Sequence, residues 1–289
     1  MVSSSVSVDR GAASIEGDPE AAPRLEPPRG GRWLLVVALA FTFIVALLAA
    51  SFIAVSFMIS TGTITPAQLS QASFQTTPEG IEIALAATAV AEVATILVAL
   101  LWPWMWSILL GRKPLGLAEW LAWRQPTRLP LWAAAVIAPL IMLPIGILVG
   151  QIFGESQVDT QVQMFSSPIL RVAASIIVVL IAPPAEEFMF RGAFYNALFP
   201  SQTDLQASAN SWQRHIIPFV IVSISFALIH LLADFTRVGS IILIFALSFV
   251  LTGLRAYTGS TRASVIAHMA WNSLAAVALI SQNILNLPQ

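Results

Sequence analysis

Long apolar runs separated by short polar stretches make up the chain from Trp33 onward. A membrane-spanning helix needs about 20 predominantly apolar residues, and seven runs approach or exceed this length. They are 33–59, 83–110, 131–153, 169–199, 216–233, 238–257 and 263–284. We therefore predict an all-α fold, a polytopic transmembrane helix bundle of about seven spans, with six and eight as the bounds.

The fourth run, 169–199, is too long for one straight crossing at about 1.5 Å per helical residue. Pro183 and Pro184 lie inside it. Proline lacks the backbone N–H and its ring clashes with the preceding turn, so the helix is expected to kink or to divide here.

Basic residues gather before the first run and between the second and third. They are Arg24, Arg29, Arg32, Arg112, Lys113, Arg124 and Arg128. The loops at 60–80 and 154–167 contain no Lys or Arg. By the positive-inside rule, the N-terminus is predicted to be cytoplasmic and these two loops to lie outside.

Tryptophans flank the basic loop between the second and third runs, as in an interfacial aromatic belt. They are Trp102, Trp104, Trp106, Trp120, Trp123 and Trp132. Within this loop, the segment from about Leu115 to Arg128 is expected to form a short amphipathic helix in the membrane interface.

Composition agrees with a membrane protein. The chain is 57% hydrophobic and 10% charged, whereas soluble domains carry about 25% charged residues. The net charge of −1 gives no basic stripe, which excludes a nucleic-acid partner. There is no cysteine, which excludes disulfides, a thiolate zinc site and a cysteine nucleophile.

Three regions follow from these patterns. Residues 1–32 are rich in Ser, Pro, Gly, Glu and Arg and are predicted to be a disordered cytoplasmic tail. The first apolar run begins too far from Met1 for a cleaved signal, so it is expected to be a retained span. Residues 33–168 hold three spans with the basic, Trp-rich cytoplasmic loop, and residues 169–289 hold the remaining spans.

Three polar clusters interrupt the apolar runs of this last region, and ionisable residues inside a membrane indicate a functional site. The clusters are Glu186, Glu187 and Arg191; Phe226 and His230; and His268 and Asn272. On a helix, Glu187 and Arg191 lie four apart and face one another as a supporting ion pair. Glu186 points about 100° away and is free for another role.

Helix lengths predict that the clusters meet. About fourteen residues separate Glu186 from the loop near Pro200, and about fourteen separate Ile216 from His230. Equal steps along antiparallel helices bring His230 to the level of Glu186. Phe226 is expected to pack beneath the site.

Two hydrolytic mechanisms use these residues. In one, Glu186, assisted by His230, is the general base for a water that attacks a peptide carbonyl. His268 and Asn272 then position the water or stabilise the oxyanion. In the other, His230, His268 and Glu186 bind Zn²⁺ and leave a fourth position for water. Both stay open, although there is no His-Glu-x-x-His run.

The three clusters resemble the E-E-x-x-x-R, F-x-x-x-H and H-x-x-x-N/D motifs of the CPBP family, the CAAX-protease and bacteriocin-processing (Abi-type) intramembrane proteases. The resemblance covers about 169–284. It implies a membrane endopeptidase in which Glu186 activates water, His230 and His268 supply imidazoles, and Asn272 assists the oxyanion. The family's mechanism is described both as metal-dependent and as glutamate-dependent, so zinc stays an alternative cofactor.

The resemblance also implies a membrane-associated protein or peptide as substrate, of the CAAX, leader-peptide or bacteriocin type. A multi-pass protein of a prokaryotic plasma membrane is expected. Two alternatives differ in class: a non-catalytic membrane scaffold or regulator of the same fold, and an ion- or proton-coupled transporter that uses Glu92 in the second span.

Overall fold

The computed structural model describes residues 31–71, 77–109, 116–153, 167–198, 213–233 and 238–285. All regular structure within these residues is helical, which confirms the predicted all-α bundle. The long helices are α1 (Gly31–Ser60), α3 (Pro78–Leu109), α5 (Leu131–Phe153), α11 (Gln213–Ala233), α12 (Val238–Thr258) and α13 (Thr261–Leu285). A composite rod of five segments occupies residues 168–198, and α2 (Pro66–Leu69) and α4 (Leu117–Trp120) are single turns.

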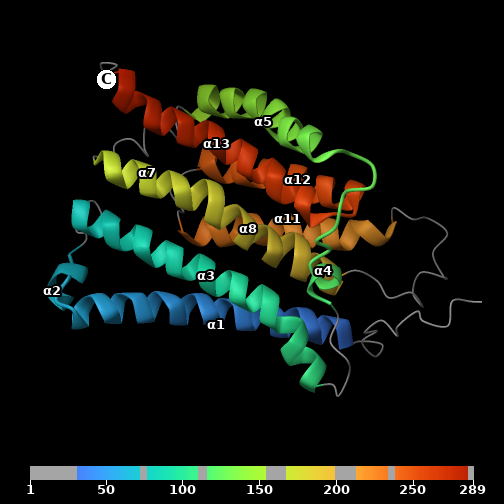
Figure 1. Ribbon diagram of the computed structural model, residues 1–289, viewed down its shortest axis with the longest axis horizontal. Helices are drawn as coiled ribbons and strands as arrows, with labels where there is room; N and C mark the ends of the chain where they lie inside the picture. Colours follow the sequence, from blue (N-terminus) through green and yellow to red (C-terminus); the bar gives the residue numbers. More distant parts are fainter. Residues whose placement is uncertain are drawn as a thin grey trace, which may run out of the picture.

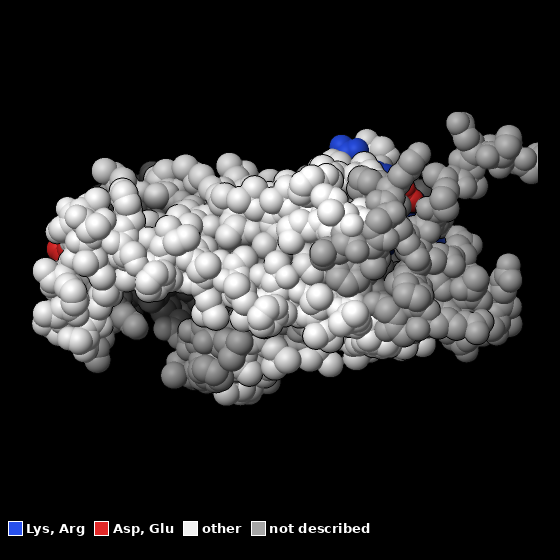
Figure 2. Space-filling model, turned by 90° about the horizontal axis from the view of Figure 1, so that it is seen from below, with Lys and Arg blue, Asp and Glu red and all other residues white. Residues whose placement is uncertain are grey.

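Six of the described helices are long and apolar enough to cross a membrane, and His215–Leu231 within α11 is a shorter apolar helix. Large apolar side chains such as Phe41 and Phe52 are 69% and 73% exposed. On the face shown in Figure 2, charged side chains among the described residues lie toward the two ends, and the part between is without them. Such a surface suits lipid, in agreement with the predicted count of about seven spans.

The helices pack around the 168–198 rod, which runs through the middle of the bundle (Figure 1). Helices α1 and α3 form a hairpin on one side of the rod, and α5 and α13 pack together on the other. The second of these contacts uses small residues: Ala134, Ala138, Ala263 and Ala267 are all fully buried. Small side chains let helix backbones approach closely, which is how helices associate in lipid.

The rod alternates between α and π geometry. Its segments are α7 (Pro168–Ile176), η2 (Ile177–Ile181), α8 (Ala182–Glu187), η3 (Phe188–Phe194) and α9 (Tyr195–Leu198). Pro183 and Pro184 stand at the start of α8. The Ala182 N–H bonds to the carbonyl of Ile177, five residues back. The rod bends at this point (Figure 1), so the predicted kink takes the form of a π segment.

The expected interfacial helix at 115–128 was wrong in extent, because α4 contains four residues. Trp120 and Trp102 are also buried, so neither belongs to an aromatic belt. Trp120 is held inside the bundle by two hydrogen bonds. Its Nε1 donates to the carbonyl of Ala99 at 3.2 Å, and its carbonyl accepts from Asn196. The exposed tryptophans Trp104, Trp123 and Trp132 fit the belt.

Several predictions fall on residues outside the described ranges. They include the tail at 1–30, with Arg24 and Arg29, and most of the loop at 154–167. Arg112 and Lys113 also lie outside the described residues. The division into three regions and the cytoplasmic N-terminus therefore stay predictions.

We predict that Gly192→Ala destabilises the protein. A Cβ at Gly192 would lie 3.3 Å from Leu121 Cα and 3.4 Å from its carbonyl oxygen, and backbone cannot move aside as a side chain can. Overpacking of this kind lowers the free energy of unfolding by about 1–3 kcal/mol, measurable by denaturant titration in detergent. Gly253→Ala is the matched control, since its Cβ would meet the Phe219 side chain at 3.8 Å. Equal loss in both variants would contradict the close contact with Leu121.

Candidate active site

Glu187 and Arg191 form a buried ion pair at the junction of α8 and η3. Glu187 is the last residue of α8, and Arg191 lies one turn later in η3. Arg191 Nη1 donates to Glu187 Oε1 at 2.8 Å, and both side chains are fully buried. The predicted facing pair is therefore present, and the π geometry of η3 does not separate it.

Helix α12 completes the surroundings of Arg191. Its guanidinium donates through Nη2 to the hydroxyl of Ser248 at 2.7 Å and to the Ser248 carbonyl at 3.0 Å. The Nε atom donates to Thr252 Oγ1 at 3.2 Å. A buried charge is tolerated only when it is paired and hydrogen-bonded, and Arg191 meets both conditions. These bonds tie the rod to α12.

Glu187 has a second partner that sequence reasoning missed. His268 Nδ1 lies 3.0 Å from Glu187 Oε1, the same oxygen that Arg191 contacts. A carboxylate paired with Arg191 accepts hydrogen bonds, so the Nδ1 hydrogen of His268 points at Glu187. The other ring nitrogen, Nε2, is thereby directed at Glu186 Oε2, at 3.8 Å.

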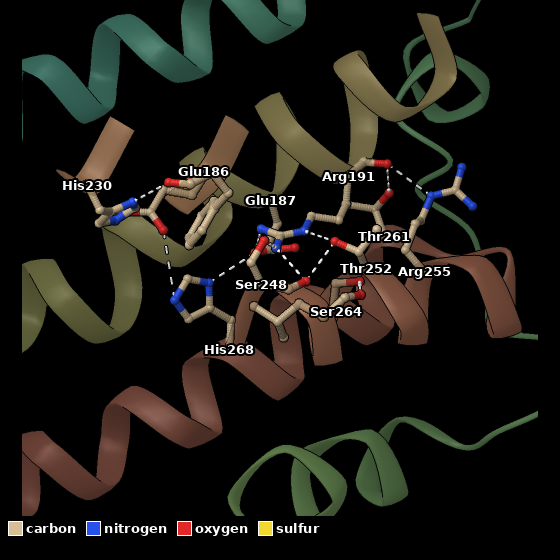
Figure 3. Close-up of polar contacts among 12 residues, drawn as sticks. Glu186, Glu187, Arg191, His230, Ser248, Thr252, Arg255, Thr261, Ser264 and His268 are labelled. Carbon is tan, nitrogen blue, oxygen red and sulfur yellow. Dashed lines mark hydrogen bonds and ion pairs between the residues drawn. The ribbon is translucent and has the colours of Figure 1, made fainter. Parts of the chain in front are cut away.

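His230 approaches the same carboxylate from α11. Its Nδ1 lies 2.8 Å from the carbonyl of Phe226, which can accept but not donate, so Nδ1 carries a hydrogen. Its Nε2 then faces Glu186 Oε1 at 3.8 Å. Figure 3 shows the result: the two imidazoles flank Glu186, each facing one of its oxygens. The predicted common depth of Glu186 and His230 is thus present.

Phe226 packs against the charged groups of the site. Its ring, 1% exposed, lies 4.4 Å from the Arg191 guanidinium carbon. The ring centroids of His230 and His268 are 4.5 Å and 6.1 Å away. The Phe226 ring therefore packs against Arg191 and against both imidazoles.

Asn272 bonds to the rod, which was not expected. Its Nδ2 donates to the carbonyl of Val178 at 2.8 Å. That carbonyl has no helical donor, because the Ala182 N–H goes to Ile177 and Pro183 has no N–H. Asn272 thus satisfies a carbonyl that the prolines leave unpaired. The second Nδ2 hydrogen is not used in this bond.

The zinc alternative can be tested against the donor geometry. A zinc ion needs three protein ligands that converge on one point at about 2.0–2.2 Å. The two Nε2 atoms instead face different oxygens of Glu186. Within the described residues, no group of three His, Asp or Glu side chains is arranged to hold a metal ion. The predicted ligand set of His230, His268 and Glu186 does not fit zinc in this arrangement.

Comparison with protein families gives a match across the part of the chain that holds all three clusters. Residues 168–274 match the model described as type II CAAX prenyl endopeptidase Rce1-like. We call this part of the chain the Rce1-like segment, because it is similar to that family. The match confirms the resemblance that the motifs indicated and, at family level, supports a CAAX-type intramembrane endopeptidase. Comparison with curated proteins and with solved structures gives no significant match.

The sequence contains patterns that could have indicated two of these contacts, namely those of Arg191 with α12 and of Asn272 with Val178. Ser248, Thr252 and Arg255 recur at helical spacing on one face of an apolar helix, which marks a polar stripe facing the rod. The proline pair signals unpaired carbonyls one turn earlier. The partner of such a carbonyl could not be predicted, because it depends on how α13 is placed against the rod.

We predict that Arg191→Met destabilises the Rce1-like segment severely. The change would leave the Glu187 carboxylate buried without a cation, which costs about 3–5 kcal/mol. The free energy of unfolding in mixed micelles measures this loss. Arg128→Met is the matched control: Arg128 is exposed and lies over the Tyr257 ring at 5.6 Å, a contact worth about 1 kcal/mol or less. Similar losses in the two variants would refute the role of the buried pair.

Proposed function

We propose that this protein is an intramembrane endopeptidase in which Glu186 activates the water that attacks a peptide bond. The observation that carries the proposal is the arrangement of Glu186 between two imidazoles whose Nδ1 hydrogens are both engaged elsewhere. Each Nε2 lies 3.8 Å from a Glu186 oxygen. That separation exceeds a hydrogen bond, and a water can bond to both atoms of such a pair.

The first chemical step is general-base catalysis. Glu186 takes a proton from the water as the water oxygen bonds to the carbonyl carbon of the substrate. His230, whose side chain is 30% exposed, holds this water together with Glu186. When the tetrahedral intermediate breaks down, the C–N bond cleaves and Glu186 returns the proton to the leaving nitrogen. Protons and charge balance without a further reactant.

The oxyanion of the intermediate is stabilised from α13. His268 and Asn272 lie one turn apart on this helix. Asn272 keeps one amide hydrogen outside its bond to Val178. His268 can donate from Nε2 when its ring is doubly protonated, and its Nδ1 is held by Glu187 at 3.0 Å. Donors held in an apolar site contribute strongly to such stabilisation.

The substrate class we propose is a membrane-associated protein or peptide that ends in a prenylated cysteine and three further residues. The Rce1-like description supports this choice over leader peptides or bacteriocin precursors. The exposed apolar helices suit a substrate that enters from the lipid. A multi-pass location in a prokaryotic plasma membrane, with a cytoplasmic N-terminus, is part of the same proposal.

The two alternatives differ in what they require. A scaffold or regulator would keep its function without Glu186, and a transporter would depend on Glu92 while tolerating the loss of Glu186. The family match gives no support to either alternative.

We predict that Glu186→Gln abolishes peptide hydrolysis and leaves the protein folded. Glutamine has the same shape but accepts no proton from water, so kcat falls about 10²–10⁴-fold. The measurement is cleavage of a fluorogenic peptide with a farnesylated cysteine by the purified protein in detergent. Glu119→Gln is the control, because Glu119 is exposed on α4. Hydrolysis at the wild-type rate by Glu186→Gln would refute the proposed base.

A chelator distinguishes the two mechanisms. We predict that 1,10-phenanthroline or EDTA leaves the rate of peptide cleavage within about twofold, since Glu186 and a water complete the reaction without a Lewis acid. The same assay without chelator and with added Zn²⁺ serves as the comparison. Loss of activity with chelator that Zn²⁺ restores would overturn the metal-free mechanism.

A further inference from the structure

The connection that leads from α4 to α5 lies against the turn between α12 and α13. The Thr261 N–H donates to the carbonyl of Ala122 at 3.1 Å, and the Thr127 N–H donates to the carbonyl of Thr258 at 3.4 Å. In Figure 1 this contact is at the end of the bundle where α4 is labelled. Two segments that are far apart in the sequence therefore form one surface.

Two arginines of this surface lie over exposed aromatic rings. The guanidinium carbon of Arg128 is 5.6 Å from the centre of the Tyr257 ring, and that of Arg262 is 5.3 Å from the centre of the Trp123 ring. A guanidinium that stacks on a ring keeps the N–H groups along its edge available, and this planar edge is suited to phosphate. The rings thus hold both cations without using their hydrogen bonds.

Arg124 adds a third cation beside them. Its Nε donates to the carbonyl of Gly259 at 2.8 Å, and its side chain is exposed. Among the described residues, no carboxylate forms an ion pair with any of the three arginines. Glu119, exposed on α4, is the nearest described carboxylate in the sequence and makes no such pair. Three positive charges are thus close together without a counter-charge in this part of the structure.

The ends of three membrane-spanning helices place this surface at the border of the membrane. The span in α5 begins at Leu131, the span in α12 ends at Thr258, and the span in α13 begins at Thr261. Trp132, beside the first of these ends, is 72% exposed, and indole rings favour the headgroup level of a bilayer. The three arginines therefore lie at the depth of phospholipid phosphates.

We propose that this surface, formed by Arg124, Arg128 and Arg262 with the rings of Trp123 and Tyr257, binds the phosphate of an anionic phospholipid. A zwitterionic lipid also has a phosphate, but the cation of its headgroup cancels the attraction. Free phosphate has the same anionic chemistry, yet only a lipid also supplies acyl chains for the apolar helices below. The inference is independent of the proposed function, because it concerns the resting protein.

The test measures lipid binding to the full chain in a neutral detergent by native mass spectrometry. Phosphatidylglycerol and phosphatidylcholine with identical acyl chains are titrated separately, so that only the headgroup differs. We expect phosphatidylglycerol to bind about tenfold or more tightly, since each basic residue near an anionic headgroup contributes about fivefold. Raising the salt concentration should reduce this preference, because salt screens exposed charges.

Variants locate the binding on the surface. Arg128→Gln and Arg262→Gln should each weaken the binding of phosphatidylglycerol about fivefold. The combined change of all three arginines to glutamine should abolish the preference over phosphatidylcholine. Arg171→Gln is the matched control, because it removes a cation from α7, at the opposite end of the rod (Figure 1), and should leave both affinities unchanged.

Three outcomes would overturn the proposal. One is equal affinity of the wild type for the two lipids, and another is a preference for phosphatidylglycerol that persists in the folded glutamine variants. Size-exclusion profiles identify the folded variants, and the single changes provide the test if the combined variant does not fold. The third outcome is displacement of the lipid by millimolar inorganic phosphate, which would indicate a site for a free anion instead. Peptide cleavage plays no part in these measurements, so the proposed function can fail separately.

Discussion

One oxygen atom, Glu187 Oε1, accepts from Arg191 at 2.8 Å and from His268 at 3.0 Å. The rod and α13 meet at this atom, and Arg191 extends the contact to α12 through its bonds to Ser248 and Thr252. In lipid, a buried carboxylate and guanidinium must satisfy one another, so these groups fix the three helices relative to each other. The site is therefore held by the same bonds that stabilise the bundle.

The adjacent glutamates have different environments for a geometric reason. Glu187 faces inward to Arg191 and is fully buried, whereas Glu186 turns toward the imidazoles and is 17% exposed. Glu187 Oε1 is occupied by Arg191 and His268, whereas the partly exposed Glu186 is accessible to a water molecule. The direction of each side chain, set by their neighbouring positions on the helix, thus separates the buried ion pair from the group that we propose as the base.

Helical periodicity was sufficient to predict the spans, the Glu187–Arg191 pair and the common depth of Glu186 and His230, since each depends on counting along regular helices. It failed where backbone irregularity decides the contact. The bond from Asn272 to Val178 exists because a π segment and Pro183 leave that carbonyl unpaired. The burial of Trp120 likewise depends on a connection that holds only the single turn α4 and whose polar groups bond inside the bundle.

The placement of Glu92 follows from the same constraint of polar satisfaction. An ionisable side chain on an apolar helix is stable where other polar groups and solvent already lower the cost of its charge. Glu92 is half-buried on α3, and this helix packs against α8, the segment that carries Glu186. A helix outside the Rce1-like segment therefore packs against the part of the chain that carries Glu186. Besides crossing the membrane, helices before residue 168 thus form packing contacts with the Rce1-like segment.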